Sequence, residues 1–206
     1  MSDKRTIKGW PVIARGTDPL LKEFTVPGTK RKLRLRKDVG PYLVAFASEY
    51  HQQIAPIDEG TLDDWAWSPV RTGRASKNIS DHCGGVAIDL NATKEGSQSK
   101  SNVWWKKHPV KALKMRALLR KYHLLEWGGD YKNFYDPMHL VIDTPDVKLV
   151  KSEMKREFVS ETGDRFIDIQ IFKSISSLSR KYAIPFLEYL DRKRITMRAG
   201  DRRLVI

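Results

Sequence analysis

Two short stretches of the sequence place metal-binding residue types beside apolar runs. In SDHCGGVAID, His82 lies in a glycine-containing turn and Asp89 ends the apolar run that follows. In DPMHLVID, His139 stands where a turn meets another apolar run, three residues after Asp136. Zinc in a hydrolase keeps about three protein ligands and one open position, and two imidazoles with one carboxylate suit it well. The alternative is a turn followed by a strand whose single acid faces water.

Two short strands must position these residues. In GGVAIDL, Asp89 shares one face of an extended chain with Ala87, and in MHLVID, His139 shares a face with Val141. If the two strands pair in antiparallel fashion, Asp89 and His139 lie side by side. His82 then closes over them from its loop, which predicts a site of two nitrogens and one oxygen.

Amphipathic helices are expected beside this sheet. Apolar residues at helical spacing predict a first helix that ends near Pro56, and Pro109 is well placed to begin a second helix that runs to Leu125. The run DDWAWSPVR predicts a short strand, and the opening 28 residues from Gly9 are expected to form loops and short strands. The predicted fold class is α+β, with a small antiparallel sheet flanked by helices around a zinc site. The apolar face of the first helix comprises Leu43, Phe46, Ala47, Tyr50 and Ile54.

Asp136 is the candidate general base. A carboxylate three residues before a metal-binding histidine can take the proton of an attacking water without binding the metal itself. The alternative is a turn residue, because aspartate before proline is common in turns. Glu126 is a second candidate base, although its place before a glycine pair favours a role in capping or positioning the loop. The other histidines are expected in surface or capping positions: His51, His108 and His123.

Taken together, these stretches resemble a known family. SDHCGGVAID fits the pattern SxHxxGxAxD, and EWGGDYKNFYDPMH fits WGGDW followed by DxxH. In this order and spacing they are similar to the zinc D-alanyl-D-alanine carboxypeptidase and L-alanyl-D-glutamate endopeptidase family, which includes VanY-type carboxypeptidases and phage endolysins. The resemblance covers roughly residues 8 to 145. It implies hydrolysis of an amide bond in the peptidoglycan stem peptide, and L-Ala-D-Glu is the expected bond.

The resemblance also implies residue roles. Arg71 would hold a substrate carboxylate or stabilise the developing oxyanion, since a guanidinium is planar and permanently charged. Ser80 would contact the substrate peptide. The alternatives are a structural salt bridge for Arg71 and a turn hydroxyl for Ser80. The implied zinc ligands are His82, Asp89 and His139, with Asp136 as general base.

Some positions depart from the family pattern. Position 81 is Asp where Asn is common, and position 131 is Tyr where Trp is common. Position 141 is Val where an acid often follows the last histidine, so an interaction that supports the ligand would be missing. The base is Asp136, as in the endopeptidase branch. None of these changes removes a proposed ligand.

The last quarter of the chain is expected to form a separate module. Residues 1–150 are expected to form the peptidase domain, residues 151–165 a charged linker, and residues 166–206 a small appendage. The appendage reads as strand, helix, helix and strand, and this βααβ order resembles the LysM module that binds peptidoglycan glycan. The GDTL opening of that family is absent, and Asp191 replaces its usual Asn. A helical wall-binding cap on the peptidase is the alternative.

Charge and composition limit the partners. The formal net charge of +13 favours an anionic partner, and cell-wall peptidoglycan is expected instead of nucleic acid because no nucleic-acid-reading motif is recognisable. A single cysteine, Cys83, excludes an internal disulfide. No signal peptide and no membrane insertion are expected, so a phage lysis enzyme would wait as a monomer in the host cytoplasm for a holin. The alternatives are a D-Ala-D-Ala carboxypeptidase, a non-catalytic wall-binding protein with a structural metal, and a basic nucleic-acid binder.

Overall fold

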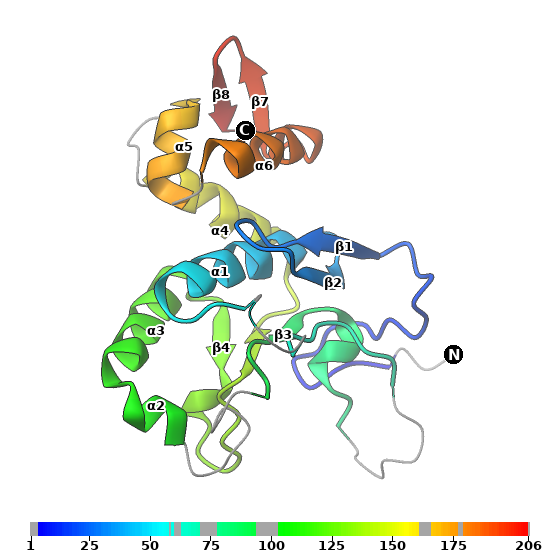
Figure 1. The fold of residues 1–206 in the computed structure, drawn as a ribbon. Helices are drawn as coiled ribbons and strands as arrows, with labels where there is room; N and C mark the ends of the chain where they lie inside the picture. The colour runs from blue at the N-terminus through cyan, green and yellow to red at the C-terminus, as the bar shows by residue number, and fades with distance from the viewer. Residues whose placement is uncertain are drawn as a thin grey trace. The chain divides into compact units, whose positions relative to one another are not determined.

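The computed structural model describes residues 4–57, 59, 63–70, 78–93, 103–160, 166–176 and 179–205. The chain divides into two compact units, which we call the N-terminal unit (Met1–Pro145) and the C-terminal unit (Asp146–Ile206). Both combine helices with small antiparallel sheets, as the predicted α+β class requires (Figure 1). None of the helices in the described part of the chain has the length and apolar character that a bilayer span needs.

The sheet of the N-terminal unit has three strands in the order β3, β5, β4, and each adjacent pair is antiparallel. The predicted pairing is confirmed, because Asp89 lies directly opposite His139. The strand predicted for DDWAWSPVR is reduced to a single bridge, in which Trp65 exchanges two 2.9 Å backbone hydrogen bonds with Asp89. The strands are β3 (Ala87–Asp89), β4 (Leu125–Trp127) and β5 (His139–Ile142).

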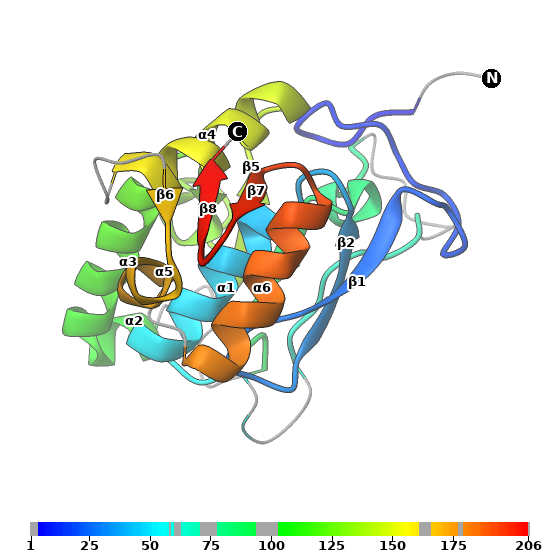
Figure 2. The ribbon, with the colours of Figure 1, turned by 90° about the horizontal axis from the view of Figure 1, so that it is seen from above.

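A second, two-stranded sheet comes from the opening segment. Strands β1 (Leu21–Thr25) and β2 (Lys32–Arg36) pair in antiparallel fashion and run side by side in both views (Figures 1 and 2). In β2, Leu33 and Leu35 are buried while Lys32 and Arg34 are exposed, which is the alternation of a half-buried strand, although Arg36 at its end is buried as well. The expectation of short strands in this segment is therefore confirmed.

Helix α1 (Gly40–Gln53) occupies the position that its apolar spacing predicts, and Pro41 lies in its first turn. Helix α3 (Pro109–Lys121) begins at the expected proline but ends four residues before the predicted end, because Leu125 belongs to β4. Aromatic rings join the two helices: Tyr122 packs edge to face on Tyr42 and Phe46, with centroids 5.3 and 5.5 Å away. The described part of the unit also contains three short helices: η1 (Asp81–Gly84), α2 (Val103–Lys107) and η2 (Gly128–Asp130).

The C-terminal unit begins with a helix where a charged linker was expected. Its sheet has the order β6, β8, β7, and the β7–β8 hairpin lies beside α6 (Figure 2). The helices are α4 (Val147–Ser160), α5 (Ile169–Ser176) and α6 (Arg180–Arg192). The strands are β6 (Phe166–Ile167), β7 (Thr196–Ala199) and β8 (Arg202–Val205).

This topology differs from the expected βααβ order in two ways: a helix precedes it, and a hairpin of two strands ends it. The segment FIDIQIF is a strand only at Phe166 and Ile167. The chain turns helical after Asp168, whose carboxylate accepts the backbone N–H groups of Gln170 and Ile171 at 2.7 and 2.8 Å. An acid that caps a helix in this way outweighs the strand-like alternation of the isoleucines.

Candidate metal centre

A short turn places His82 over the sheet. Ser80 precedes helix η1, and its hydroxyl accepts the backbone N–H of His82 at 3.4 Å. Gly85 ends η1 with a φ of +68°, a conformation that residues with a Cβ rarely adopt. A Cβ at this position would also lie 2.8 Å from the backbone nitrogen of Arg36. The glycine therefore lets the chain turn from η1 directly into β3.

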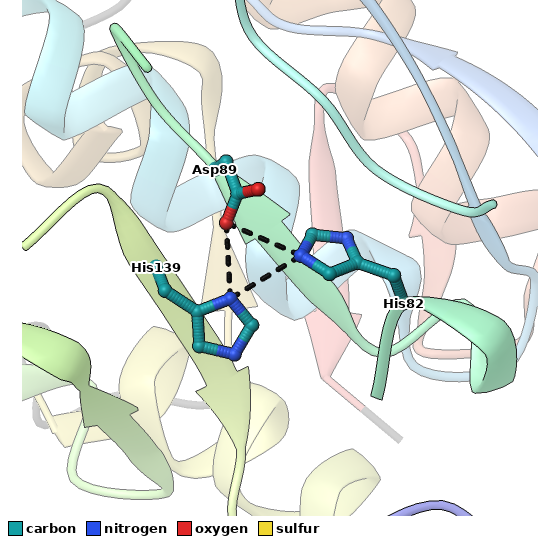
Figure 3. Close-up of side chains that lie close together, drawn as sticks. All are labelled: His82, Asp89 and His139. Atoms are coloured by element: carbon teal, nitrogen blue, oxygen red, sulfur yellow. Dashed lines mark hydrogen bonds and ion pairs between the residues drawn. The ribbon is translucent and has the colours of Figure 1, made fainter. Parts of the chain in front are cut away.

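Three side chains from η1, β3 and β5 converge on one point (Figure 3). His82 Nε2 lies 3.2 Å from Asp89 Oδ1 and 3.2 Å from His139 Nδ1, and His139 Nδ1 lies 2.9 Å from Asp89 Oδ1. All three side chains are largely buried, with 9 to 12% of their surface exposed. Within the described residues, this is the one group of three such side chains close enough to hold an ion.

The backbone fixes which nitrogen of His82 faces this point. His82 Nδ1 lies 2.6 Å from the carbonyl oxygen of Ala66. A carbonyl can only accept a hydrogen bond, so Nδ1 carries the proton and donates it. The lone pair of Nε2 is therefore directed towards Asp89 and His139, as a metal ligand requires.

The spacing of the three atoms fits zinc. With zinc-to-ligand distances of about 2.0–2.1 Å and tetrahedral geometry, ligand atoms lie about 3.3 Å apart. The separations of 2.9 to 3.2 Å among the His82, Asp89 and His139 atoms agree with this value. Two imidazoles and a carboxylate are also a ligand set that zinc enzymes use. These residues can therefore hold zinc.

Burial and mutual charge control protonation in the metal-free cluster. Burial tends to raise the pKa of Asp89, but the hydrogen bonds and charges of both histidines outweigh it, and its pKa falls below the ordinary value. Burial tends to lower the pKa of His82, yet Asp89 raises it above the ordinary value. Asp89 is therefore ionised at neutral pH.

Asp136 reaches the cluster from the loop between β4 and β5. Its backbone N–H donates to the Gly128 carbonyl at 2.9 Å, and its own carbonyl accepts the His139 N–H at 3.0 Å. A Cβ on Gly128 would overlap the carbonyl oxygen of Asp136, so only glycine permits this approach. Burial and the Asp89 carboxylate raise the pKa of Asp136, while the charges of both imidazoles lower it in part. A raised pKa makes a carboxylate a better proton acceptor.

The other predicted site residues have different outcomes. Ser80 is exposed and caps η1, so its turn role is present in the structure. Arg71 lies outside the described residues. Glu126 forms a 2.6 Å ion pair with Lys8 and hydrogen bonds to Tyr131, so its contacts agree with a positioning role.

Sequence reasoning missed three contributors to the site. Gly128 belongs to the WGGD motif, and that motif was the signal that could have found it. Ala66 acts through its backbone carbonyl, which no side-chain pattern reveals. Lys8 lies more than 70 residues before the metal-binding motif, although its N–H donates to Asp81 Oδ1 at 2.9 Å and its ammonium reaches Glu126.

The C-terminal unit has a different kind of surface. The exposed side chains of α6 and of the hairpin are mainly basic, with Glu188 and Asp201 as the exposed acids among them. The Asp191 carboxylate is bound within the unit, because it accepts hydrogen bonds from Thr196 Oγ1 at 2.6 Å and Arg203 Nε at 2.8 Å. The exposed basic residues are Arg180, Lys181, Arg192, Lys193, Arg194, Arg198 and Arg202.

Comparison with known proteins separates the two units. Residues 74–142 match the family model described as D-alanyl-D-alanine carboxypeptidase. This match includes all three residues of the cluster and Asp136, and it supports a peptidase. Together with the cluster, it supports the peptidase family whose motifs the sequence resembles.

Residues 158–205 match a second family model, described as elongation factor SelB, winged helix. A selenocysteine-specific elongation factor from Desulfomicrobium baculatum is 56% identical over 36 residues, which are 18% of this chain and 6% of that protein. The chain therefore aligns with only a small part of that relative. The matched range includes most of the C-terminal unit, so the comparisons support a winged helix here and give no support to the LysM-like interpretation.

Proposed function

We propose that the N-terminal unit is a zinc-dependent peptidase of the endolysin type that hydrolyses an amide bond in the peptidoglycan stem peptide, L-Ala-D-Glu being the expected bond. The observation that carries the proposal is the convergence of His82, Asp89 and His139 within 3.2 Å of one another. The match of residues 74–142 to a carboxypeptidase family supports the peptide substrate.

Different residues of this unit would bind the metal, transfer the proton and fix the tautomer of His82. Zinc held by His82, Asp89 and His139 would supply a Lewis acid that polarises a carbonyl and lowers the pKa of water to about 7. Asp136 accepts the proton from the attacking water and later gives it to the leaving amine. In the metal-free cluster, burial raises the pKa of Asp136. The Ala66 carbonyl keeps His82 in the required tautomer.

Two substrate contacts extend the proposal. Arg71 holds a substrate carboxylate or the developing oxyanion, and Ser80 contacts the peptide. The exposure of Ser80, two residues before His82, supports this role, although its hydroxyl also caps η1. An Arg71→Lys variant tests the first contact: lysine cannot make the two parallel hydrogen bonds of a guanidinium, so the KM for a stem peptide with a free carboxylate rises.

The test of the peptidase is product analysis with defined muropeptides. Zinc-loaded protein is expected to release the stem peptide after its first alanine, and a chelator is expected to stop the reaction. Loss of a terminal D-alanine alone would show a carboxypeptidase instead. If the zinc-loaded protein cleaves no wall peptide, the proposed function is wrong.

A second candidate function is nucleic-acid binding by the C-terminal unit, which the sequence interpretation kept only as an alternative for the whole chain. The specific observation is a helix pair, α5 and α6, followed by a hairpin, with exposed arginines on α6 and both strands of the hairpin. The match to a winged helix supports it. Basic side chains on a helix beside a hairpin suit the phosphates of a duplex.

Binding measurements test this second function against the wall-binding role first expected for the unit. The protein is titrated into a labelled RNA or DNA duplex, and in parallel it is sedimented with purified peptidoglycan sacculi. Micromolar or tighter duplex binding with a steep salt dependence supports nucleic-acid binding. Retention on sacculi without duplex binding supports the wall-binding role and contradicts the nucleic-acid proposal.

A further inference from the structure

Glu126 lies on the same face of the three-stranded sheet as two candidate metal ligands. It pairs with Val141 in the β4–β5 ladder, and Val141 pairs with Ala87 on its other side. Side chains two residues apart on a strand share a face, and so do residues directly opposite across an antiparallel ladder. Glu126 is therefore the diagonal neighbour of His139, within reach of a long side chain.

The ring of His139 has a second nitrogen that faces away from the cluster. Its Nδ1 is directed at Asp89 Oδ1 and His82 Nε2, so Nε2 lies on the outer side (Figure 3). When imidazole binds a metal through one nitrogen, the other carries a proton, and an acceptor near this N–H orients the ring and raises its basicity. For His82 that acceptor is the Ala66 carbonyl.

The Glu126 carboxylate is fixed in place by two neighbours. Lys8 Nζ lies 2.6 Å from Glu126 Oε2 and 2.5 Å from Asp143 Oδ1, and the Tyr131 side chain hydrogen bonds to Glu126. Burial tends to raise the pKa of Glu126, but these two neighbours outweigh it and the pKa falls below its ordinary value. The carboxylate is therefore ionised at neutral pH. One ammonium beside two carboxylates leaves a net negative charge on this face.

Strand β5 itself offers no acid at the next position on this face. Val141 follows His139 there and is fully buried, with 0% of its surface exposed. The charge of His139 contributes to the lowered pKa of Glu126, which agrees with their diagonal placement across the ladder. The neighbouring strand thus supplies the carboxylate that β5 lacks.

We propose that Glu126 is a positioning residue for His139, and that its carboxylate, anchored by Lys8 and Tyr131, strengthens the hold of His139 on the metal. This inference rests on the zinc site of the proposed function. It also makes Lys8, outside the range that matches the carboxypeptidase family, a part of the site's support.

Two variants, each with one residue of the Lys8–Glu126 ion pair replaced, test the proposal. Glu126→Gln removes the carboxylate, and Lys8→Met removes the ion pair but leaves the carboxylate beside His139, still bonded to Tyr131. Zinc affinity is measured by competition with a chromophoric chelator in the full chain. Glu126→Gln is expected to lower it by about 10–100-fold, whereas Lys8→Met, which keeps the carboxylate but removes one of its two anchors, should lower it by less. The matched control is Glu23→Gln, which breaks an exposed ion pair with Lys32 in the β1–β2 sheet.

The cobalt-loaded protein gives a second measurement. A changed orientation of His139 alters the visible absorption of bound cobalt in Glu126→Gln, and the alteration should be smaller in Lys8→Met. Equal losses of zinc affinity in both variants would overturn the proposal, because the ion pair and not the carboxylate would then matter. Unchanged affinity in Glu126→Gln would overturn it as well and leave the peptidase intact. Failure of the unsubstituted protein to bind zinc would overturn the proposed function and this inference together.

Discussion

The two units of the chain use charged side chains in opposite ways. In the N-terminal unit, His82, Asp89 and His139 are largely buried and face one another. In the C-terminal unit, basic side chains of α6 and the hairpin project into solvent. Burying such groups costs free energy unless they are paired or bind a metal, so a buried cluster indicates a site for chemistry. An exposed basic surface attracts a polyanion at long range without a comparable cost. Substitutions made in each unit separate these two uses.

The largest effect is expected from His139→Ala. The substitution leaves two of the three proposed ligands, so zinc binding and muropeptide hydrolysis should fall to the level of a buffer control. Binding of duplex or sacculi by the C-terminal unit should not change. Zinc content by mass spectrometry and product analysis check the two halves of this expectation. The control is His123→Ala, an exposed histidine just after α3; residual zinc-dependent hydrolysis by His139→Ala would contradict the ligand assignment.

The second-largest effect is expected from Asp136→Asn. The amide cannot accept a proton, so kcat for muropeptide hydrolysis should fall by about 10²–10⁴-fold. Zinc affinity should be retained, because Asp136 is not among the three converging ligands. The control is Asp130→Asn, whose exposed carboxylate pairs with Arg116. A kcat close to that of the unsubstituted protein would exclude Asp136 as the base.

Gly128→Ala should reduce activity without removing the metal. The new Cβ would overlap the Asp136 carbonyl oxygen, so the loop must shift. Overpacking of this kind costs about 1–3 kcal/mol of unfolding free energy. Urea denaturation and kcat measure the two effects, with Gly16→Ala as a control whose neighbours are side chains alone. Normal kcat in Gly128→Ala would show that the close approach does not position Asp136.

Arginine substitutions in the hairpin should affect binding alone. Replacing both Arg198 and Arg202 with alanine should weaken duplex binding, and the slope of log affinity against log salt should fall by about one for each phosphate that is no longer neutralised. The kcat for a small soluble muropeptide should not change, because neither side chain belongs to the metal centre. A lower kcat on that substrate would show that the two units are functionally coupled.

The smallest effect concerns pH and the metal-free protein. The folded state holds a proton on His82 more tightly than the unfolded state, because its pKa is raised above 6.5. This contribution to stability is fully present below the unfolded pKa and is lost as pH rises through the folded pKa, by at most about 1.4 kcal/mol per pH unit. All six tryptophans lie in the N-terminal unit, so their fluorescence during urea denaturation reports on it. A stability that rises between about pH 6 and pH 8 would contradict the raised pKa.

The metal centre could be predicted because its residues carry chemistry at fixed positions in short strands. Period-two spacing in β3 and β5 gave the faces of Asp89 and His139, the expected antiparallel pairing brought them side by side, and the pairing is confirmed. Strand β4 was missed because Leu125 continues the apolar spacing of α3, and three residues are too few to show a period of their own. Lys8 could not be predicted as part of the site, since nothing local links it to Glu126.

The C-terminal unit shows the limit of pattern alone. Ile167, Ile169 and Ile171 alternate like a strand, yet Ile169 and Ile171 are helical, with Asp168 as the cap and Phe172 buried against α6, where it stacks on Phe186 at 5.7 Å. Residues two apart share a face in a strand but lie on nearly opposite sides of a helix, so the alternation favours a strand. The helix depends on the Asp168 cap, which the sequence contains, and on tertiary contacts that the local sequence does not encode.

X-ray absorption at the zinc edge of the zinc-loaded protein tests the central claim most directly. The structure leads us to expect nitrogen and oxygen neighbours only, at about 2.0–2.1 Å, with the outer-shell scattering of two imidazoles. A sulfur neighbour at about 2.3 Å, which only a cysteine or methionine could supply, or a spectrum with fewer than two imidazoles, would contradict a site built from His82, Asp89 and His139.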